Sequence, residues 1–282
     1  MNSPDMLDGL VCVVTGAAQG IGFATATEMA RRGGAVALLD LDDSKAQAVA
    51  DALAARFGAR TMSARCDVSD QASVEAAIAK AHRELGHVHV LVNNAGIMTP
   101  QLAPVSAMPV ADFDRMIEVH LRGAFLCSRA AIPLMERDGY GRIVNLSSVL
   151  GLMGIPFRIG YAAAKTAVIG LTRSLAVEVA RKGITVNAVA PGYILTETLR
   201  TRLAEGKLDY ATYAERAPIG RWGLPEEVAR LIVFLTLPGS GFITGAIIPI
   251  DGGFTMRGDP AEDIGPRPES MASVRHLFGI VE

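Results

Sequence analysis

TGAAQGIG, at residues 15–22, is the stretch that decides which fold this sequence predicts. It joins an apolar run, residues 10–15, to a segment of helical period, and its glycines stand at positions 16, 20 and 22. This G-x-x-x-G-x-G spacing is a variant of the pattern with which a strand-to-helix turn binds the pyrophosphate of a dinucleotide. Backbone N–H groups and the helix dipole favour an anion there, although glycines at a tight turn can also serve packing alone.

Outward from this turn, apolar runs rich in β-branched residues alternate with segments of helical period. The expected strands are residues 10–15, 35–40, 60–66, 88–93, 142–147, 185–190 and 246–250, and the expected helices are residues 20–32, 43–57, 69–85, 111–137, 161–181 and 225–237. Such alternation produces a parallel sheet covered by helices on both faces. The sequence therefore predicts one α/β domain over residues 1–255, a doubly wound fold of Rossmann type with about seven parallel strands. Pro133 is expected to kink its helix or to end it early.

Composition and charge exclude several classes of protein. Half of the 282 residues are apolar and a fifth are charged, which excludes a disordered, collagen-like or coiled-coil chain. The net charge of −2 and the lack of a basic run argue against nucleic acid as a partner. Three widely spaced cysteines predict neither a disulfide framework nor a metal site. With Asp5 and Asp8 near the start and no long apolar run, the sequence predicts no membrane segment and a cytoplasmic location.

Asp40 indicates which dinucleotide is bound. It ends the second expected strand and follows Gly22 by 18 residues, close to the spacing at which an acid accepts hydrogen bonds from the adenosine ribose hydroxyls. A 2′-phosphate would be repelled by this carboxylate. The positions where a basic residue could offset the repulsion hold Gln19 and Leu41, so NAD is favoured over NADP. The alternative reading of Asp40 is a solvated acid at a strand end.

Tyr161 and Lys165 are the candidate acid/base pair. They stand four residues apart at the start of a strong helix and so share one face. Ionising a phenol at neutral pH costs about 4 kcal/mol, and one ammonium about 4 Å away returns a similar amount at an effective dielectric near 20. A charged nicotinamide would complete the shift. Such a pair often arises by chance, but here it follows a strand that ends in NLSS, residues 145–148, whose hydroxyls can face the same crevice.

Taken together, the motifs resemble those of the short-chain dehydrogenase/reductase family. TGAAQGIG (15–22), NNAG (93–96), NLSS (145–148), YAAAK (161–165), PG (191–192) and DGG (251–253) follow the family's order across residues 10–254. The resemblance implies a nicotinamide cofactor and assigns Tyr161 as the catalytic acid/base. It implies that Lys165 binds the nicotinamide ribose and lowers the pKa of the tyrosine. Ser148, 13 residues before Tyr161, matches the hydroxyl that binds the substrate oxygen.

The glycine turn, Asp40 and the resemblance together predict the contacts of the cofactor. Asp67 and Val68, after the third strand, can touch the adenine, although Asp67 can equally cap the next helix. The predicted contacts are Gly16, Gln19, Gly20, Ile21, Gly22, Asp40, Leu41, Asp67, Val68, Asn94, Ala95, Gly96, Tyr161, Lys165, Pro191, Gly192, Ile194 and Thr196. The resemblance implies that the last four lie against the nicotinamide carboxamide, and that Asn93 supports the sheet.

One position departs from the family's pattern. Many members carry, in the helix before the fifth strand, an asparagine that holds a water in a proton relay through the lysine. The matching stretch here, residues 118–121, holds His120. Two readings stay open: a buried histidine with a structural role, or a catalytic histidine that itself relays protons.

The sequence predicts an NAD-dependent oxidoreductase, an alcohol dehydrogenase that interconverts a secondary alcohol and a ketone. The alternatives are an NADPH-dependent ketoreductase of the 3-oxoacyl type and a dinucleotide sensor without catalysis. The substrate is a small molecule whose pocket is expected near Met98, residues 150–159, Tyr193 and a lid formed by residues 195–221, a segment that could also be a surface helix pair. Nearby arginines at 158, 200 and 202 either meet an anionic or sugar-like group or are solvated.

Assembly is argued through the family alone, whose members are usually tetramers or dimers. The resemblance implies a homotetramer or a homodimer packed through the helices at residues 111–137 and 161–181. Residues 256–282, proline-rich and polar before a short apolar tail, are expected to be either a disordered terminus or an arm that docks on a neighbouring subunit.

Overall fold

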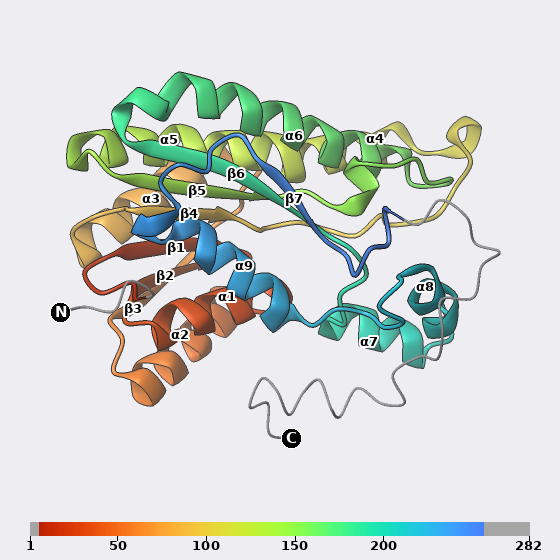
Figure 1. Cartoon of the computed structure of the whole chain (residues 1–282), viewed down its shortest axis with the longest axis horizontal. Helices are drawn as coiled ribbons and strands as arrows, with labels where there is room; N and C mark the ends of the chain where they lie inside the picture. Colours follow the sequence, from red (N-terminus) through yellow and green to blue (C-terminus); the bar gives the residue numbers. More distant parts are fainter. Residues whose placement is uncertain (1–5, 257–282) are drawn as a thin grey trace.

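The structure is a computed structural model, and it describes residues 6–256 (Figure 1). These residues form a seven-stranded parallel sheet in the order β3-β2-β1-β4-β5-β6-β7. The strands are β1 (Val11–Thr15), β2 (Ala35–Asp40), β3 (Thr61–Arg65), β4 (Val90–Asn93), β5 (Gly141–Leu146), β6 (Ile184–Pro191) and β7 (Ile247–Ile250). The strand order reverses between β1 and β4, which is where open sheets of this kind bind ligands. The predicted doubly wound α/β fold is confirmed.

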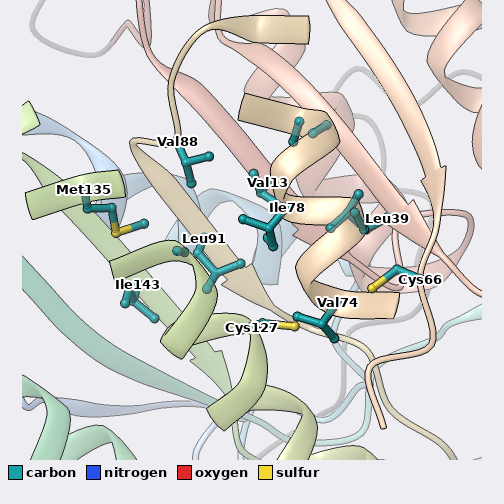
Figure 2. Packing of buried hydrophobic residues seen from close by; sticks show 14 of the residues in the cluster. Val13, Leu39, Cys66, Val74, Ile78, Val88, Leu91, Cys127, Met135 and Ile143 are labelled. Atoms are coloured by element: carbon teal, nitrogen blue, oxygen red, sulfur yellow. The ribbon is translucent and has the colours of Figure 1, made fainter. Parts of the chain in front are cut away.

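Helices cover both faces of the sheet (Figure 1). One layer contains α1 (Gly20–Arg31), α2 (Asp43–Phe57) and α9 (Pro225–Thr236), and the other contains α3 (Gln71–Leu85), α5 (Gly123–Asp138) and α6 (Ile159–Val179). Because both faces are covered, the central strands are continuous apolar runs rather than alternating ones. Figure 2 shows Val13 and Leu91 of the sheet packed with Val74 of α3 and Cys127 of α5.

The three cysteines are free and buried in the two hydrophobic cores. Cys12 lies on the α1 and α9 side of the sheet, whereas Cys66 and Cys127 lie on the α3 and α5 side. Burial raises the pKa of the Cys12 and Cys66 thiols to about 12, and burial also raises the pKa of Cys127 well above its ordinary value. The thiols are therefore protonated and unreactive at neutral pH.

Side-chain caps set the helix boundaries. Asp42 Oδ1 accepts from the Lys45 N–H at 3.1 Å at the start of α2, and Gly58, with φ +64°, ends that helix. Asp70 Oδ2 accepts from the Ser73 N–H at 2.8 Å at the start of α3. Such caps satisfy donors that the first turn of a helix leaves open. The helix expected from residue 69 therefore begins at Gln71.

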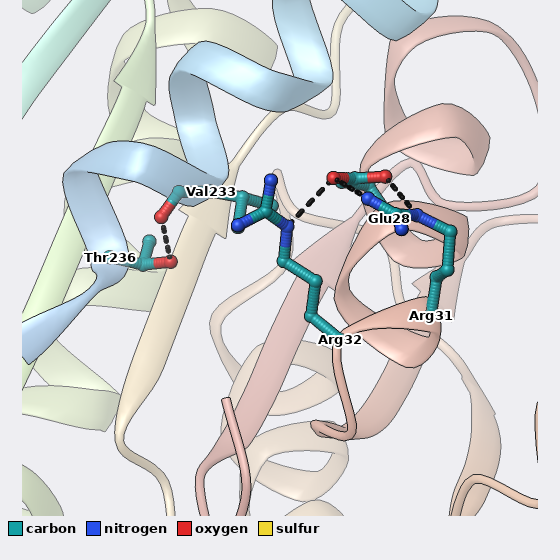
Figure 3. A network of polar contacts seen from close by, with 5 residues as sticks. All are labelled: Glu28, Arg31, Arg32, Val233 and Thr236. Carbon is teal, nitrogen blue, oxygen red and sulfur yellow. Dashed lines mark hydrogen bonds and ion pairs between the residues drawn. The ribbon is translucent and has the colours of Figure 1, made fainter. Parts of the chain in front are cut away.

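Figure 3 shows polar groups on the neighbouring helices α1 and α9. The Glu28 carboxylate accepts hydrogen bonds from Arg31 at 2.7 and 2.8 Å and from Arg32 at 2.8 Å. Although burial opposes ionisation, the hydrogen bonds and charges of the two arginines lower the pKa of Glu28. On α9, the Thr236 hydroxyl donates to the Val233 carbonyl at 2.8 Å. The buried polar groups drawn in Figure 3 thus have partners.

The helix expected over residues 111–137 contains an irregular turn. A short helix, α4 (Val110–Met116), passes into a π-helical turn at Ile117–Arg122 and then into α5. Turns of this kind are rare in proteins, and those that do occur are frequently found at functional sites. The expectation that Pro133 ends the helix early is wrong: α5 continues to Asp138, and Gly139, with φ +62°, ends it.

Two short helices, α7 (Glu197–Ala204) and α8 (Tyr210–Arg216), form most of the segment at residues 195–221. In Figure 1 they lie apart from both helix layers. Short helical turns at Val105–Ala107, Val149–Gly151, Ala180–Lys182 and Pro238–Ser240 complete the order of elements. Within residues 6–256, no helix combines the length and apolarity needed to cross a membrane. The proposed C-terminal arm falls outside the described residues, apart from Met256.

Candidate active site

Two loops meet where β1 and β4 end. The Thr15 Oγ1 accepts hydrogen bonds from the backbone N–H groups of Asn94 and Ala95, each at 3.0 Å. In return, Asn94 Nδ2 donates to the carbonyl oxygens of Thr15 and Gly16 at 2.9 and 3.0 Å. The glycine turn at residues 15–22 is therefore fixed to the segment at residues 93–96.

The glycine turn has no room for a side chain at positions 16 and 22. Gly16 has φ +63°, and a Cβ there would lie 2.9 Å from the Ala95 Cα. A Cβ on Gly22 would collide with the carbonyl oxygen of Gly16. Gln19 precedes α1 without a side-chain cap, and the first turn of α1 holds no acidic residue. Uncapped N–H groups at a helix start suit an anion such as a pyrophosphate.

Asp40 lies next to this turn. Its Oδ2 accepts from the Ala18 N–H at 2.9 Å and its Oδ1 accepts from the Asp42 N–H at 3.1 Å. Leu41 beside it is exposed. The sheet also places Arg65, an exposed residue, directly opposite Asp40 in the β2–β3 ladder. The sequence reasoning missed this cation, because strand register cannot be read from a single sequence.

Asp67 and Val68 lie beyond the end of β3. Asp67 Oδ1 accepts from the Ser69 N–H at 3.0 Å and from the Ser69 hydroxyl at 2.6 Å. These hydrogen bonds lower the pKa of Asp67, and the one from the Ser69 hydroxyl has the largest effect. Partial burial acts in the opposite direction but is weaker. Asp67 does not cap α3, because Asp70 does so. Val68 is buried, and a Cβ on Gly123 would lie 2.9 Å from its Cγ2.

Ser148 and Tyr161 meet at the carboxyl edge of the sheet. Ser148 follows β5, and its Oγ accepts from the Leu150 N–H at 3.2 Å. Tyr161, in the first turn of α6, forms a hydrogen bond with Ser148. Burial raises the pKa of Tyr161, while the Ser148 hydrogen bond and the nearby charge of Arg158 act against that rise. Without a bound cofactor, the phenol is therefore protonated at neutral pH.

Lys165 lies one turn further along α6 and is 5% exposed. Its Nζ donates to the Leu146 carbonyl at 2.6 Å and lies 5.7 Å from the centre of the Tyr161 ring. Burial lowers the pKa of Lys165 to about 7. Burial therefore disfavours the charged ammonium on which the expectation from sequence depended.

His120 projects from the π-helical turn toward the same side chains. Its Nε2 lies 2.9 Å from the Ile97 carbonyl, and its ring meets the Tyr161 ring edge-on with centroids 5.1 Å apart. Burial, and then the charge of Lys165, lower the pKa of His120 well below its ordinary value. The neutral ring donates from Nε2, and within residues 6–256 its buried Nδ1 has no partner. A second cavity of about 10 Å³, the space of one water, touches His120, Lys165 and Thr15.

A cavity of about 300 Å³ brings many of the predicted residues together. The predicted residues that line it are Ile21, Asn94, Gly96, His120, Ser148, Tyr161, Lys165, Pro191, Gly192, Ile194 and Thr196, and those outside its lining are Gly16, Gln19, Gly20, Gly22, Asp40, Leu41, Asp67, Val68 and Ala95. Met98 and Tyr193 line it as expected, and of residues 150–159 only Leu150 and Arg158 do. Ile97 and Thr99 beside Met98, and Thr198 and Leu208 of the expected lid, also line it. The sequence reasoning missed Leu102 and Val149. They follow or flank the motifs, but their side-chain directions depend on loop paths without periodicity.

Tyr193, which lines the cavity, is backed by other aromatic side chains. Tyr193 stacks on Tyr213 of α8 with ring centroids 4.0 Å apart. Trp222 and Phe254 pack at 5.4 and 5.5 Å from Tyr193. The segment at residues 195–221 is anchored as well by a bridge between Ile194 and Gly223. Five residues of this segment line the cavity, namely Thr196, Thr198, Leu199, Arg202 and Leu208. Its role as a lid stays a prediction.

Comparisons with known proteins agree with this arrangement. A family model described as enoyl-(acyl carrier protein) reductase matches residues 16–255. The cis-4-hydroxycyclohexanecarboxylate dehydrogenase of Sinomonas cyclohexanicum is 46% identical over 248 residues, which cover 87% of this chain and 96% of that protein. The 3-oxoacyl-[acyl-carrier-protein] reductase of Thermotoga maritima is 38% identical over 256 residues, which cover 89% of this chain and 99% of that protein.

A solved structure is similar over most of its length. The crystal structure of a short-chain type dehydrogenase/reductase from Mycobacterium marinum superimposes with a TM-score of 0.83 at 35% sequence identity, covering 90% of this chain and 98% of that one. The glycine turn, the Ser148–Tyr161–Lys165 arrangement and these similarities agree. The chain belongs to the short-chain dehydrogenase/reductase family of nicotinamide-dependent oxidoreductases.

Proposed function

We propose that this chain is an NAD-dependent dehydrogenase that interconverts a secondary alcohol and a ketone. The observation that carries the proposal is the meeting of Ser148, Tyr161 and Lys165 in one cavity at the carboxyl edge of the sheet. A hydroxyl, a phenol and an amine around one opening suit proton transfer at an alcohol oxygen. The similarity to a relative named as the dehydrogenase of a ring alcohol also supports a reaction between an alcohol and a ketone.

The residues present fit a dinucleotide. Gly16 and Gly22 keep the turn free of side chains, and the start of α1 offers uncapped N–H groups. We propose that the cofactor is held by the glycine turn, Asp40, residues 94–96, Tyr161, Lys165 and residues 191–196. A nicotinamide held by these residues would supply the acceptor for the hydride that leaves the carbinol carbon of the alcohol.

The chain's own residues would handle the proton. Ser148 Oγ hydrogen-bonds the substrate oxygen, and Tyr161 Oη accepts the hydroxyl proton as the carbonyl forms. Lys165, with its pKa lowered to about 7 by burial, stabilises the phenolate in its charged form. His120 borders, together with Lys165, a cavity of one water's size, so we propose that it takes part in passing the proton onward.

A second candidate function is an NADPH-dependent ketoreductase of the 3-oxoacyl type. The similarity to the Thermotoga maritima reductase supports it, and so does Arg65, which could meet a 2′-phosphate from its place opposite Asp40. The Asp40 carboxylate opposes it, because a 2′-phosphate would be repelled there.

The test is turnover of secondary alcohols, polyols and hydroxyacyl thioesters with NAD and with NADP in parallel, followed by the absorbance of the reduced cofactor. We expect turnover with NAD, and Tyr161→Phe should lower kcat by at least about 100-fold while NAD still binds. Tyr140→Phe is the matched control, because Tyr140 donates only to the Thr236 carbonyl, at 3.0 Å. A preference for NADP with thioesters would favour the second candidate, and full activity of Tyr161→Phe would remove the tyrosine from its role.

A further inference from the structure

Two guanidinium groups line the cavity from different elements. Arg158 directly precedes α6, and Arg202 lies in the last turn of α7. Arg200, the third arginine that the sequence singles out, is exposed and outside the cavity lining. Around the two arginines the lining is largely apolar, with residues such as Met98, Leu102, Leu150, Leu199 and Leu208.

Neither arginine has an acidic partner. No aspartate or glutamate lines the cavity, and the ion pairs found within residues 6–256 include neither Arg158 nor Arg202. Arg158 is about half-buried. Placing a cation in a partly buried, apolar setting is costly unless an anion accompanies it. An anionic group on a ligand would supply that missing partner.

The protein holds Arg158 in place through neutral groups. Its Nη1 donates to the Tyr193 hydroxyl at 3.4 Å, and Tyr213, which stacks on Tyr193, is a second hydrogen-bond partner. A guanidinium has five N–H donors, so most of them stay available to a ligand. Phe157, just before it, has φ +65°, a strained conformation that persists only where the surroundings enforce it. The hydrogen bond to Tyr193 orients the guanidinium of Arg158.

We propose that Arg158, assisted by Arg202 on α7, binds an anionic group of the substrate, so that the substrate is a compact secondary alcohol or ketone carrying an acid group. A planar guanidinium can bind the two oxygens of a carboxylate, sulfonate or phosphate at once. Tyr161 lies close enough to Arg158 for their charges to interact. The anion would therefore be bound at one end of the cavity while the hydroxyl reaches Ser148 and Tyr161. That the bound molecule is an alcohol or ketone rests on the proposed function. That the two arginines bind an anion does not.

The first experiment compares matched substrates. The probes are 3-hydroxybutanoate, 2-hydroxypropane-1-sulfonate and 2-hydroxypropyl phosphate, with 3-hydroxybutanamide as the neutral counterpart, and 5-hydroxyhexanoate with its amide as a longer pair. We expect an anionic member to exceed its neutral counterpart in kcat/KM, and the preferred acid group to identify the anion.

Arg158→Met should lower kcat/KM for that anion by about 10- to 100-fold, and change the value for the amide much less. Arg158→Lys should restore part of the loss, and Arg200→Met, the matched control, should change neither value.

The second experiment measures binding without turnover, because Arg158→Met could also weaken the fold. Trp222 is the sole tryptophan and packs 5.4 Å from Tyr193, so its fluorescence reports on this wall of the cavity. Butanoate, propane-1-sulfonate and propyl phosphate are titrated against butanamide in the intact protein and in Arg202→Met, with melting temperatures as a check on folding. Equal affinity for the amide and all three anions would overturn the inference. Tight anion binding without turnover of any alcohol would instead count against the proposed function alone.

Discussion

At the scale of single residues, the site combines three titratable groups whose charged forms are disfavoured by burial. Burial raises the pKa of Tyr161 and lowers the pKa of Lys165 to about 7. His120 is held neutral between them by burial. Such perturbed groups cluster where chemistry is performed. The simple estimate of an ammonium beside a phenol left out this burial, which opposes the charged form of both groups.

Asp40 and Arg65 lead to a prediction on cofactor choice. Asp40→Asn keeps an oxygen that can accept from the Ala18 N–H but removes the negative charge, so Arg65 can then attract a 2′-phosphate. We expect the ratio of kcat/KM for NAD to that for NADP to fall about tenfold. Adding Arg65→Met should reverse most of the gain with NADP. An unchanged ratio in Asp40→Asn would mean that the carboxylate does not face the adenosine ribose.

At the scale of elements, most of the architecture could be predicted, because strands covered on both faces are continuous apolar runs. The glycine turn and the motif after β5 correctly marked the carboxyl edge of the sheet. The π-helical turn at Ile117–Arg122 could not be predicted, since a stretch this short is below the window in which apolar periodicity separates one helix type from another. The pairing of Asp40 with Arg65 depends on strand register, and the direction of Arg158 depends on its hydrogen bond to Tyr193. None of these is encoded in a short motif.

A histidine pair, His87 and His89, lies at the amino end of β4, opposite the end that borders the cavity. His87 Nδ1 lies 3.0 Å and His89 Nε2 lies 3.8 Å from the Asp138 carboxylate. These three side chains are close enough to surround a metal ion. However, His89 Nδ1 accepts from the Val11 N–H at 3.0 Å, which leaves the proton of the neutral ring on Nε2, the atom that would face a metal. The arrangement fits a hydrogen bond between His87 and Asp138, with His89 held by Val11, better than metal coordination.

His89 predicts a pH effect on stability. Burial lowers the pKa of His89, and the charge of the neighbouring His87 lowers it further, whereas the charge of Asp138 acts to raise it. The Tyr140 ring also lies beside His89. A lowered folded-state pKa means that its contribution to stability is complete above about pH 6.5 and is lost as the pH falls through the folded-state value. His89→Asn offers a non-titrating acceptor to Val11. We expect the fall in melting temperature between pH 8 and pH 5 to be several degrees smaller in the variant, and an equal fall would show that His89 does not contribute.

At the scale of the whole molecule, residues 6–256 by themselves form the two large hydrophobic cores, a smaller third one and the cavity. The family model ends at residue 255, close to the same point. The chain therefore contains a complete dinucleotide-type sheet before its last segment begins. A homotetramer or homodimer, and a role for the last segment in it, stay predictions.

Truncation after Met256 tests that role. Because the cores lie before this point, we expect the shortened chain to fold with a melting temperature within a few degrees of the full chain. Light scattering should show weaker assembly, or kinetics should show a higher KM, if the segment is an intersubunit arm. Unchanged assembly and unchanged KM would reject the arm, and failure to fold would contradict the placement of the cores.

The three buried thiols have a practical consequence for studying motion around the cavity. Since the whole chain has only these cysteines and all are protonated at neutral pH, maleimide reagents should leave the native protein unlabelled. A single cysteine introduced at the exposed position 200 on α7, as Arg200→Cys, would then be the one site for a fluorophore or spin label. Opening and closing of the segment that borders the cavity could be followed in solution without removing any native residue from the cores.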